Sequence, residues 1–161
     1  MVDEKIVKCG ECDGEARLVS GKVVYPHRDD LAEKRFWMCE KCGAYVGCHK
    51  VSDGTLPLGS PAGKETRAPR AKVHALIDPP WQSKKVQRSA DYYWISQKLG
   101  IDIDDCHVGM FDAEKCKKVL GMLEKGWVKE ASKLHNEYVR RRRKIGKVEY
   151  LSKKRQMEEE G

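Results

Sequence analysis

The 161-residue sequence lacks the features that would place it in or across a membrane. No apolar run approaches the length that a bilayer-spanning helix needs, and the first residues, Met-Val-Asp-Glu-Lys-Ile, contain no apolar stretch of the kind found in secretory signals. We therefore expect a cytoplasmic protein with no membrane partner.

Familiar catalytic and base-reading motifs are also missing. The chain has no Gly-rich phosphate loop and no Gly-x-Ser-x-Gly elbow, which excludes the commonest nucleotide-hydrolysing and serine-hydrolase signatures. Nothing in it resembles a helix-turn-helix or a Cys₂His₂ reading helix, so strong preference for particular bases is not expected. The sequence leaves enzyme activity open, and we favour a protein that is not an enzyme.

Seven cysteines stand out against these absences. Cytoplasmic thiols are kept reduced and seven is an odd count, so metal binding is favoured over a disulfide framework. Two Cys-x-x-Cys pairs, Cys9–Cys12 and Cys39–Cys42, are separated by 26 residues. Each pair can present two thiolates, and four thiolates complete a tetrahedral site with no position left for water. The spacing predicts one structural zinc ion held by Cys9, Cys12, Cys39 and Cys42.

Two alternatives to this ligand set stay open. A rubredoxin-like iron site uses similar cysteine knuckles and is the main competing metal. Cys48 and His49 closely follow the second pair and could replace a ligand, although a buried structural role for Cys48 is favoured. Gly14 and Gly43 follow the two pairs, and we expect them to let the backbone turn sharply beside the thiolates.

The order of patterns along the chain predicts an α+β protein. A β-rich zinc ribbon over residues 1–50, with strands near Ala16–Val19 and Lys22–Tyr25, precedes a Gly/Pro-rich loop over residues 51–66. A mainly helical body follows over residues 67–125, and a long basic C-terminal helix with its tail covers residues 126–161.

Helix-start and helix-stop signals divide the helical body into three parts. Pro69 suits the first turn of one helix, and Asp78-Pro79-Pro80 is expected to end it. A second helix is expected from about Val86 to Leu99, ending at Gly100. Asp112 is expected to cap a third helix, whose buried stripe comprises Cys116, Val119, Leu120 and Leu123.

The final segment carries a heptad-like seam. Its members alternate at spacings of four and three: Trp127, Ala131, Leu134, Tyr138, Arg141, Ile145 and Val148. Three heptads are marginal for an independent coiled coil, so packing on the protein's own body is favoured. Self-association through this helix stays a possible second use of the seam.

Positive charge is concentrated in two segments. Residues 64–88 contain seven basic and two acidic residues, and residues 126–161 contain eleven and six, so each segment carries +5 of a net +7 chain. Such clustering is typical of proteins that bind polyanions. The candidate nucleic-acid-binding residues are Arg67, Arg70, Lys72, Lys84, Lys85, Arg88, Arg140, Arg141, Arg142, Arg143 and Lys144. We therefore predict binding to DNA or RNA with low sequence specificity.

An ordered succession of motifs resembles a phage-associated family described as zinc-finger-containing. The likeness covers residues 1 to about 123 and comprises the two knuckles, the segments Tyr45–His49, Pro57–Ala62 and Cys106–Asp112, and the residues Arg67, Arg70, His74, Asp78 and Trp81. The resemblance implies zinc, a phage or prophage origin and hence a bacterial host cell. It implies no established activity.

Two further function classes remain open. A phage protein of this size can dock on a host enzyme such as the transcription machinery, with the C-terminal helix as the docking element. A zinc-stabilised nuclease is the other alternative, and its candidate site residues are His49, His74, Asp78 and His107.

Overall fold

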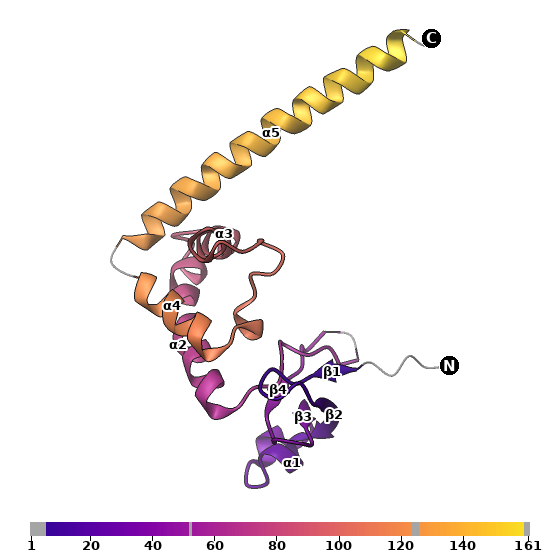
Figure 1. Ribbon diagram of the computed structural model, residues 1–161, viewed down its shortest axis with the longest axis vertical. Helices are drawn as coiled ribbons and strands as arrows, with labels where there is room; N and C mark the ends of the chain where they lie inside the picture. The colour runs from indigo at the N-terminus through magenta and orange to yellow at the C-terminus, as the bar shows by residue number, and fades with distance from the viewer. Residues whose placement is uncertain (1–5, 52, 124–125, 160–161) are drawn as a thin grey trace. The chain divides into compact units, whose positions relative to one another are not determined.

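The computed structural model describes residues 6–51, 53–123 and 126–159, and Figure 1 traces its helices and strands. The chain divides into two compact units. The ribbon unit consists of residues up to Leu76 together with His107–Met122. The helical unit consists of Ile77–Cys106 together with residues from Leu123 onward.

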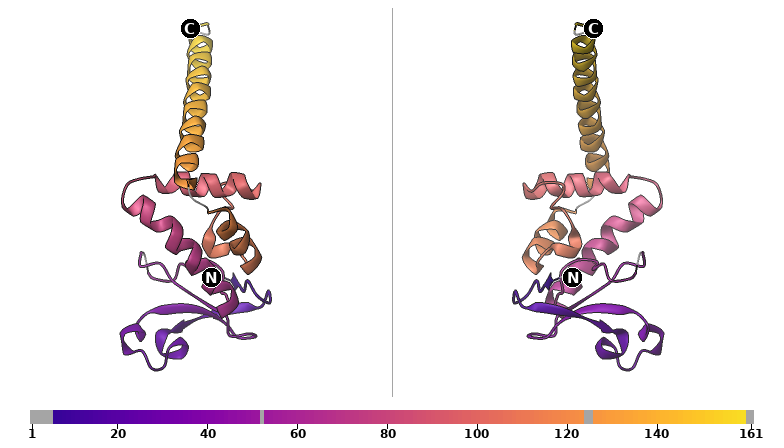
Figure 2. Two further views of the ribbon diagram at one scale, coloured as in Figure 1. Left: turned by 90° about the vertical axis from the view of Figure 1, so that its left-hand side faces the viewer. Right: turned by 90° about the vertical axis from the view of Figure 1, so that its right-hand side faces the viewer.

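The ribbon unit is built on a four-stranded antiparallel sheet. Its strands are β1 (Val7–Lys8), β2 (Glu15–Ser20), β3 (Arg35–Cys39) and β4 (Tyr45–Gly47), and they lie in chain order. Figure 2 shows this sheet in the indigo and purple that mark the N-terminal residues. An antiparallel sheet followed by helices, including a long C-terminal one, confirms the predicted α+β class.

The second predicted strand, Lys22–Tyr25, is wrong. These residues lie in and after a single helical turn, α1 (Gly21–Val24), which is followed by a 3₁₀ turn, η1 (Asp29–Leu31). Ser20 pairs with Arg35 at the end of the β2–β3 ladder, so the chain between them has to leave the sheet and return. A Cβ at Gly21 would lie 1.7 Å from the Leu31 carbonyl oxygen, so only glycine permits this close return.

One long helix replaces the proline-bounded one predicted for the start of the helical body. α2 (Lys64–Gln82) begins five residues before Pro69 and continues through Pro79 and Pro80. Both predicted ends are therefore wrong. The carbonyls of Pro79 and Pro80 accept hydrogen bonds from Ser83 and Lys85 at 3.0 and 2.9 Å, which closes the last turn. Proline has no backbone N–H to donate, but its carbonyl can still accept a hydrogen bond. Two prolines near the C-terminus of a helix therefore remove two backbone hydrogen bonds without ending the helix.

The next two helices agree with their sequence signals. α3 (Arg88–Leu99) ends at Gly100, which has a φ of 66°. A short 3₁₀ turn, η2 (Val108–Met110), precedes α4 (Ala113–Met122). The Asp112 carboxylate accepts a hydrogen bond from the Lys115 amide at 2.7 Å, as expected of an N-cap. Cys116 and Val119 are fully buried on α4 as predicted, but Leu120 is only partly buried and Leu123 lies beyond the end of the helix, so half of the predicted stripe is confirmed.

The C-terminal helix α5 (Trp127–Glu159) has two parts within the helical unit. Its first part packs against α3. The ring centroids of Trp127 and Trp94 are 5.7 Å apart, and Tyr138 stacks on Tyr93 with a centroid distance of 4.5 Å. Every side chain described from Arg140 onward is exposed. Figures 1 and 2 show this second part extending past α3. Among the residues that the structure describes, no helix is long and apolar enough to cross a membrane.

Candidate functional site

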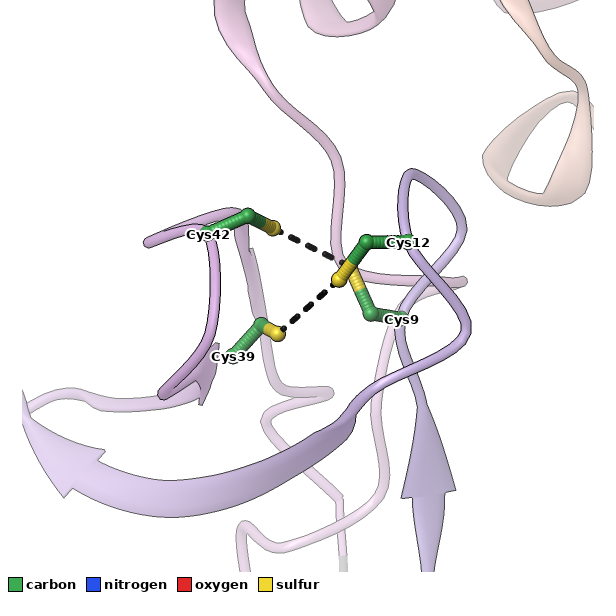
Figure 3. Close-up of side chains that lie close together, drawn as sticks. All are labelled: Cys9, Cys12, Cys39 and Cys42. Carbon is green, nitrogen blue, oxygen red and sulfur yellow. Dashed lines mark hydrogen bonds between the residues drawn. The ribbon is translucent and has the colours of Figure 1, made fainter.

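Four sulfur atoms converge at one end of the ribbon sheet (Figure 3). Cys9 and Cys12 lie in the turn between β1 and β2, whereas Cys39 is the last residue of β3 and Cys42 lies in the turn between β3 and β4. The Sγ atoms of Cys9 and Cys42 are 3.5 Å apart, those of Cys12 and Cys39 are 3.6 Å apart, and all four lie within 4.8 Å of one another. A tetrahedral zinc with Zn–S bonds of ~2.3 Å separates its sulfurs by ~3.8 Å. The four cysteines therefore fit a zinc ion.

The two knuckles share one backbone pattern. The amide of Cys9 donates to the Gly14 carbonyl and the amide of Cys39 to the Ala44 carbonyl, both at 2.8 Å. Gly43 adopts a φ of 72°, as its position predicted. In the first knuckle the left-handed residue is Asp13, with a φ of 55°, so the predicted role of the following glycine needs correction.

Gly14 is required by space rather than by its dihedral angle. A Cβ there would lie 3.2 Å from both Cys12 Sγ and Cys39 Sγ. Sulfur atoms held by a metal cannot retreat, so any side chain at this position would crowd the ligand set.

The thiols differ in how readily they lose a proton. Burial disfavours the Cys39 thiolate, but hydrogen bonds from the Cys42 and Lys41 amides outweigh it and lower the pKa of Cys39 to about 7. The Ala44 amide favours the Cys42 thiolate, yet burial and the neighbouring thiols raise the pKa of Cys42 to about 12. Burial also raises the pKa of Cys9. Four thiolates this close repel one another, so a divalent cation has to accompany full deprotonation.

A loop distant in sequence supports the first knuckle. The Pro61 carbonyl accepts a hydrogen bond from the Gly10 amide at 3.0 Å. The Glu11 carboxylate accepts one from the Gly63 amide at 2.9 Å. A hydrogen bond from the Thr66 side chain contributes most to lowering the pKa of Glu11. Neither Glu11 nor Thr66 belongs to a recognisable motif, so the sequence alone does not identify either residue as part of the site.

The guanidinium groups of Arg67 and Arg70 bind the protein's own backbone. Arg70 is 8% exposed and donates to the carbonyls of Phe111 at 2.7 Å and Ser60 at 2.9 Å. Arg67 donates to the Ala62 carbonyl at 2.6 Å and lies 3.8 Å above the ring of Tyr45. Both side chains hold the ribbon unit together, which leaves their charges less available to a partner.

The remaining predicted cations are exposed on the surface. Of these predicted cations, the exposed one in the ribbon unit is Lys72. In the helical unit the exposed cations are Lys84, Lys85, Arg88, Arg140, Arg141, Arg142, Arg143 and Lys144. The charge that faces solvent at the predicted positions is therefore concentrated in the helical unit.

The histidines considered for a nuclease site are not brought together as a metal site. His49 and His107 are exposed, whereas His74 and Asp78 are partly buried on α2. Among the described residues, only the four cysteines form a group of three or more His, Cys, Asp or Glu side chains that could hold an ion. Cys48 and His49 lie outside that group, so neither replaces a cysteine ligand.

Comparison with known proteins supports the same centre. No match was found among curated proteins or among solved structures. The family model for a zinc-finger-containing domain, DUF3268, matches residues 5–126, most of the chain. This description names zinc rather than iron, and the four-cysteine group accommodates one structural zinc ion. The chain belongs to the DUF3268 family of zinc-finger-containing domains.

Proposed function

We propose that this protein binds nucleic acid, with low sequence specificity, through exposed cations of the helical unit. The observation that carries the proposal is the position of Arg140–Lys144 on α5. All five side chains are exposed, as is every described side chain that follows them on α5. A surface of this kind is open to a polyanion along its length.

The five cations lack acidic partners within the described part of the chain. The described ion pairs involve other residues, and the one hydrogen bond from this group runs from Arg142 Nη1 to the Tyr138 hydroxyl at 3.2 Å. Five consecutive positions cover more than one helical turn, so the charges surround the helix and repel their neighbours. Phosphate groups would relieve that repulsion and release condensed counterions as they bind.

Three further cations lie in the same unit, in the α2–α3 turn and at the first residue of α3. Lys84 and Lys85 are exposed in the turn, and Arg88 is exposed at the start of α3. We assign them to the same surface, and Lys72 of the ribbon unit is a secondary candidate. The proposal leaves out Arg67 and Arg70, because their donors are used within the ribbon unit.

The zinc ion has a structural role in this scheme. Four thiolates fill its coordination sphere, so no position is open for water or substrate. The zinc stabilises the ribbon unit and its supporting loop, while phosphate contacts come from side chains.

Binding of fluorescent single-stranded DNA, duplex DNA and RNA to the zinc-loaded full chain tests the proposal. Replacing Arg140, Arg141, Arg142 and Arg143 by alanine should weaken binding at least tenfold at low salt, and alanine preserves the helix. The matched control replaces four exposed lysines outside the proposed surface, Lys117, Lys118, Lys129 and Lys133. Equal binding by the two variants would remove α5 from the interface, and no binding by the wild type would refute the proposal.

A second candidate function, docking on a protein, rests on a different observation. Ile145, Val148 and Leu151 of α5 are 58%, 66% and 39% exposed, and their spacing places them along one side of the helix. A partner helix, from a second copy or from a host protein such as a component of the transcription machinery, would cover them. The family resemblance leads us to infer a phage or prophage origin, with the bacterial cytoplasm as the setting.

Purification from infected cells with and without nuclease treatment separates the two candidates. Partners that disappear after nuclease treatment support nucleic-acid binding. A host protein that remains bound, and is lost when Ile145 and Val148 are replaced by serine, supports docking.

A further inference from the structure

A hollow of about 490 Å³ opens on the helical unit, between the α2–α3 turn and α5. Its walls come from residues 81–90 on one side and from residues 132–136 on the other. The side chains relevant here are Trp81, Lys84, Lys85, Arg88, His135 and Asn136. Its volume lies in the range of small-ligand sites in proteins.

The charge of the lining is of one sign. Three cations contribute to it, and no residue that lines it is acidic. Lys84 adopts a φ of 58°, a conformation that costs free energy for a residue with a side chain. The hollow is therefore suited to a ligand that carries negative charge.

His135 adds a polar ring to the lining of the hollow. Its side chain is 9% exposed and lines the hollow. Two aromatic rings lie beside it: the ring centroids of Tyr93 and Tyr138 are 6.3 and 6.4 Å from its own. Each imidazole nitrogen can donate or accept a hydrogen bond, so the ring offers polar contacts to a ligand in the hollow.

Trp81 gives the hollow an aromatic wall. Its indole N–H donates to the Asp78 carboxylate at 3.2 Å, which uses the only polar group of the side chain and fixes its orientation. Arg88 lies 5.8 Å from the centre of the same ring. The side chain is partly exposed, so it can offer its ring surface for stacking.

We propose that the hollow receives one unpaired nucleotide of a nucleic-acid strand. Lys84, Lys85 and Arg88 would hold its phosphates, Trp81 would contact the face of its base, and His135 and Asn136 would meet the base edge. A base paired in a duplex cannot reach such a hollow without leaving its stack, so the site favours single strands. This inference rests on the proposed function and adds a strand preference to it.

Two pairs of variants of the zinc-loaded full chain test the site. Lys84→Gly with Lys85→Ala removes two lining charges, and glycine suits the φ of position 84; Lys129→Ala with Lys133→Ala removes two charges elsewhere in the unit. Trp81→Ala removes the aromatic wall, whereas Trp81→Phe keeps an aromatic ring. The probes are adenosine 5′-monophosphate, inorganic phosphate, a 12-nucleotide single strand and the corresponding duplex.

The wild type should bind the single strand about tenfold tighter than the duplex, and adenosine monophosphate tighter than phosphate. Trp81→Ala and the Lys84/Lys85 variant should each lose most of the strand preference, while Trp81→Phe and the Lys129/Lys133 control should keep it. Equal affinity of the wild type for both strand forms, or an unchanged preference in the Lys84/Lys85 variant, would overturn the inference. Absence of wild-type binding to either strand form would refute the proposed function, whereas binding to both forms with equal affinity would refute this inference alone, so the two failures are distinguishable.

Discussion

Arg70 contacts a residue 41 positions further along the chain: its Nε donates a hydrogen bond to the carbonyl oxygen of Phe111 at 2.7 Å. The other end of the guanidinium donates to the Ser60 carbonyl and hydroxyl, each at 2.9 Å. Gly59 and Gly109 approach so closely beside it that a Cβ on Gly59 would lie 2.1 Å from the Gly109 carbonyl oxygen. The motifs Pro57–Ala62 and Cys106–Asp112 that carry the family resemblance therefore include segments that meet in the ribbon unit.

Replacing Arg70 by methionine should destabilise the ribbon unit by about 2–4 kcal/mol, because buried carbonyls would lose a charged donor. The free energy of unfolding in urea measures this loss. Lys72→Met is the matched control, because Lys72 is exposed two residues further along α2, and it should change stability by less than about 0.5 kcal/mol. Equal effects of the two substitutions would show that the Arg70 contacts contribute little.

The purified protein should contain about one zinc per chain, and Cys39→Ser should lose both the metal and the fold of the ribbon, because metal binding and folding are coupled in such modules. Elemental analysis and circular dichroism measure the two effects. Cys48→Ser should retain zinc, since Cys48 lies outside the four-sulfur group. Iron in place of zinc, or full zinc content in Cys39→Ser, would contradict the assigned centre.

Asp91 should make the stability of the helical unit depend on pH. Its side chain is completely buried and neither carboxylate oxygen has a hydrogen-bond partner in the described structure. Burial, followed by repulsion from Asp78, raises the pKa of Asp91 from 3.8 to about 7, against an opposing effect of Arg88. The folded state therefore binds this proton more tightly than the unfolded state does. The contribution of the protonated Asp91 carboxyl to the free energy of unfolding is full below about pH 4 and decreases as the pH rises towards 7.

Asp91→Asn should remove most of this decrease and stabilise the protein at pH 8 by roughly 1–4 kcal/mol relative to the wild type. Thermal unfolding between pH 4 and pH 8 provides the measurement. Asp104→Asn, which changes an exposed carboxylate in the same unit, should leave the pH profile unchanged. A wild-type profile that the Asp91 substitution does not alter would show that this carboxyl is not buried in solution.

Local chemistry explains which features were predictable. Four cysteines at knuckle spacing identify a metal site without any knowledge of tertiary contacts, and Gly100 and Asp112 mark helix ends through their own conformational and capping preferences. The wrong strand at Lys22–Tyr25 and the helix through Pro79 depend on where the chain must go next, which local propensity does not encode.

Side-chain roles that depend on distant partners were the least accessible to prediction. Arg70 is part of a basic segment in the sequence, but its burial and its backbone acceptors become visible only when residues 60 and 111 are adjacent. His135 follows a seam residue of the C-terminal helix and was not selected, because its significance comes from the hollow beside it.

The salt dependence of binding to a single-stranded oligonucleotide tests the proposed nucleic-acid surface most directly. Each phosphate contact contributes about −0.7 to the slope of log K against log salt on a single strand. Four alanines at Arg140–Arg143 should therefore make the slope shallower by about 2–3, while the Lys117/Lys118/Lys129/Lys133 control keeps the wild-type slope. A wild-type slope near zero, or one that the α5 substitutions do not change, would contradict a phosphate-binding role for this helix.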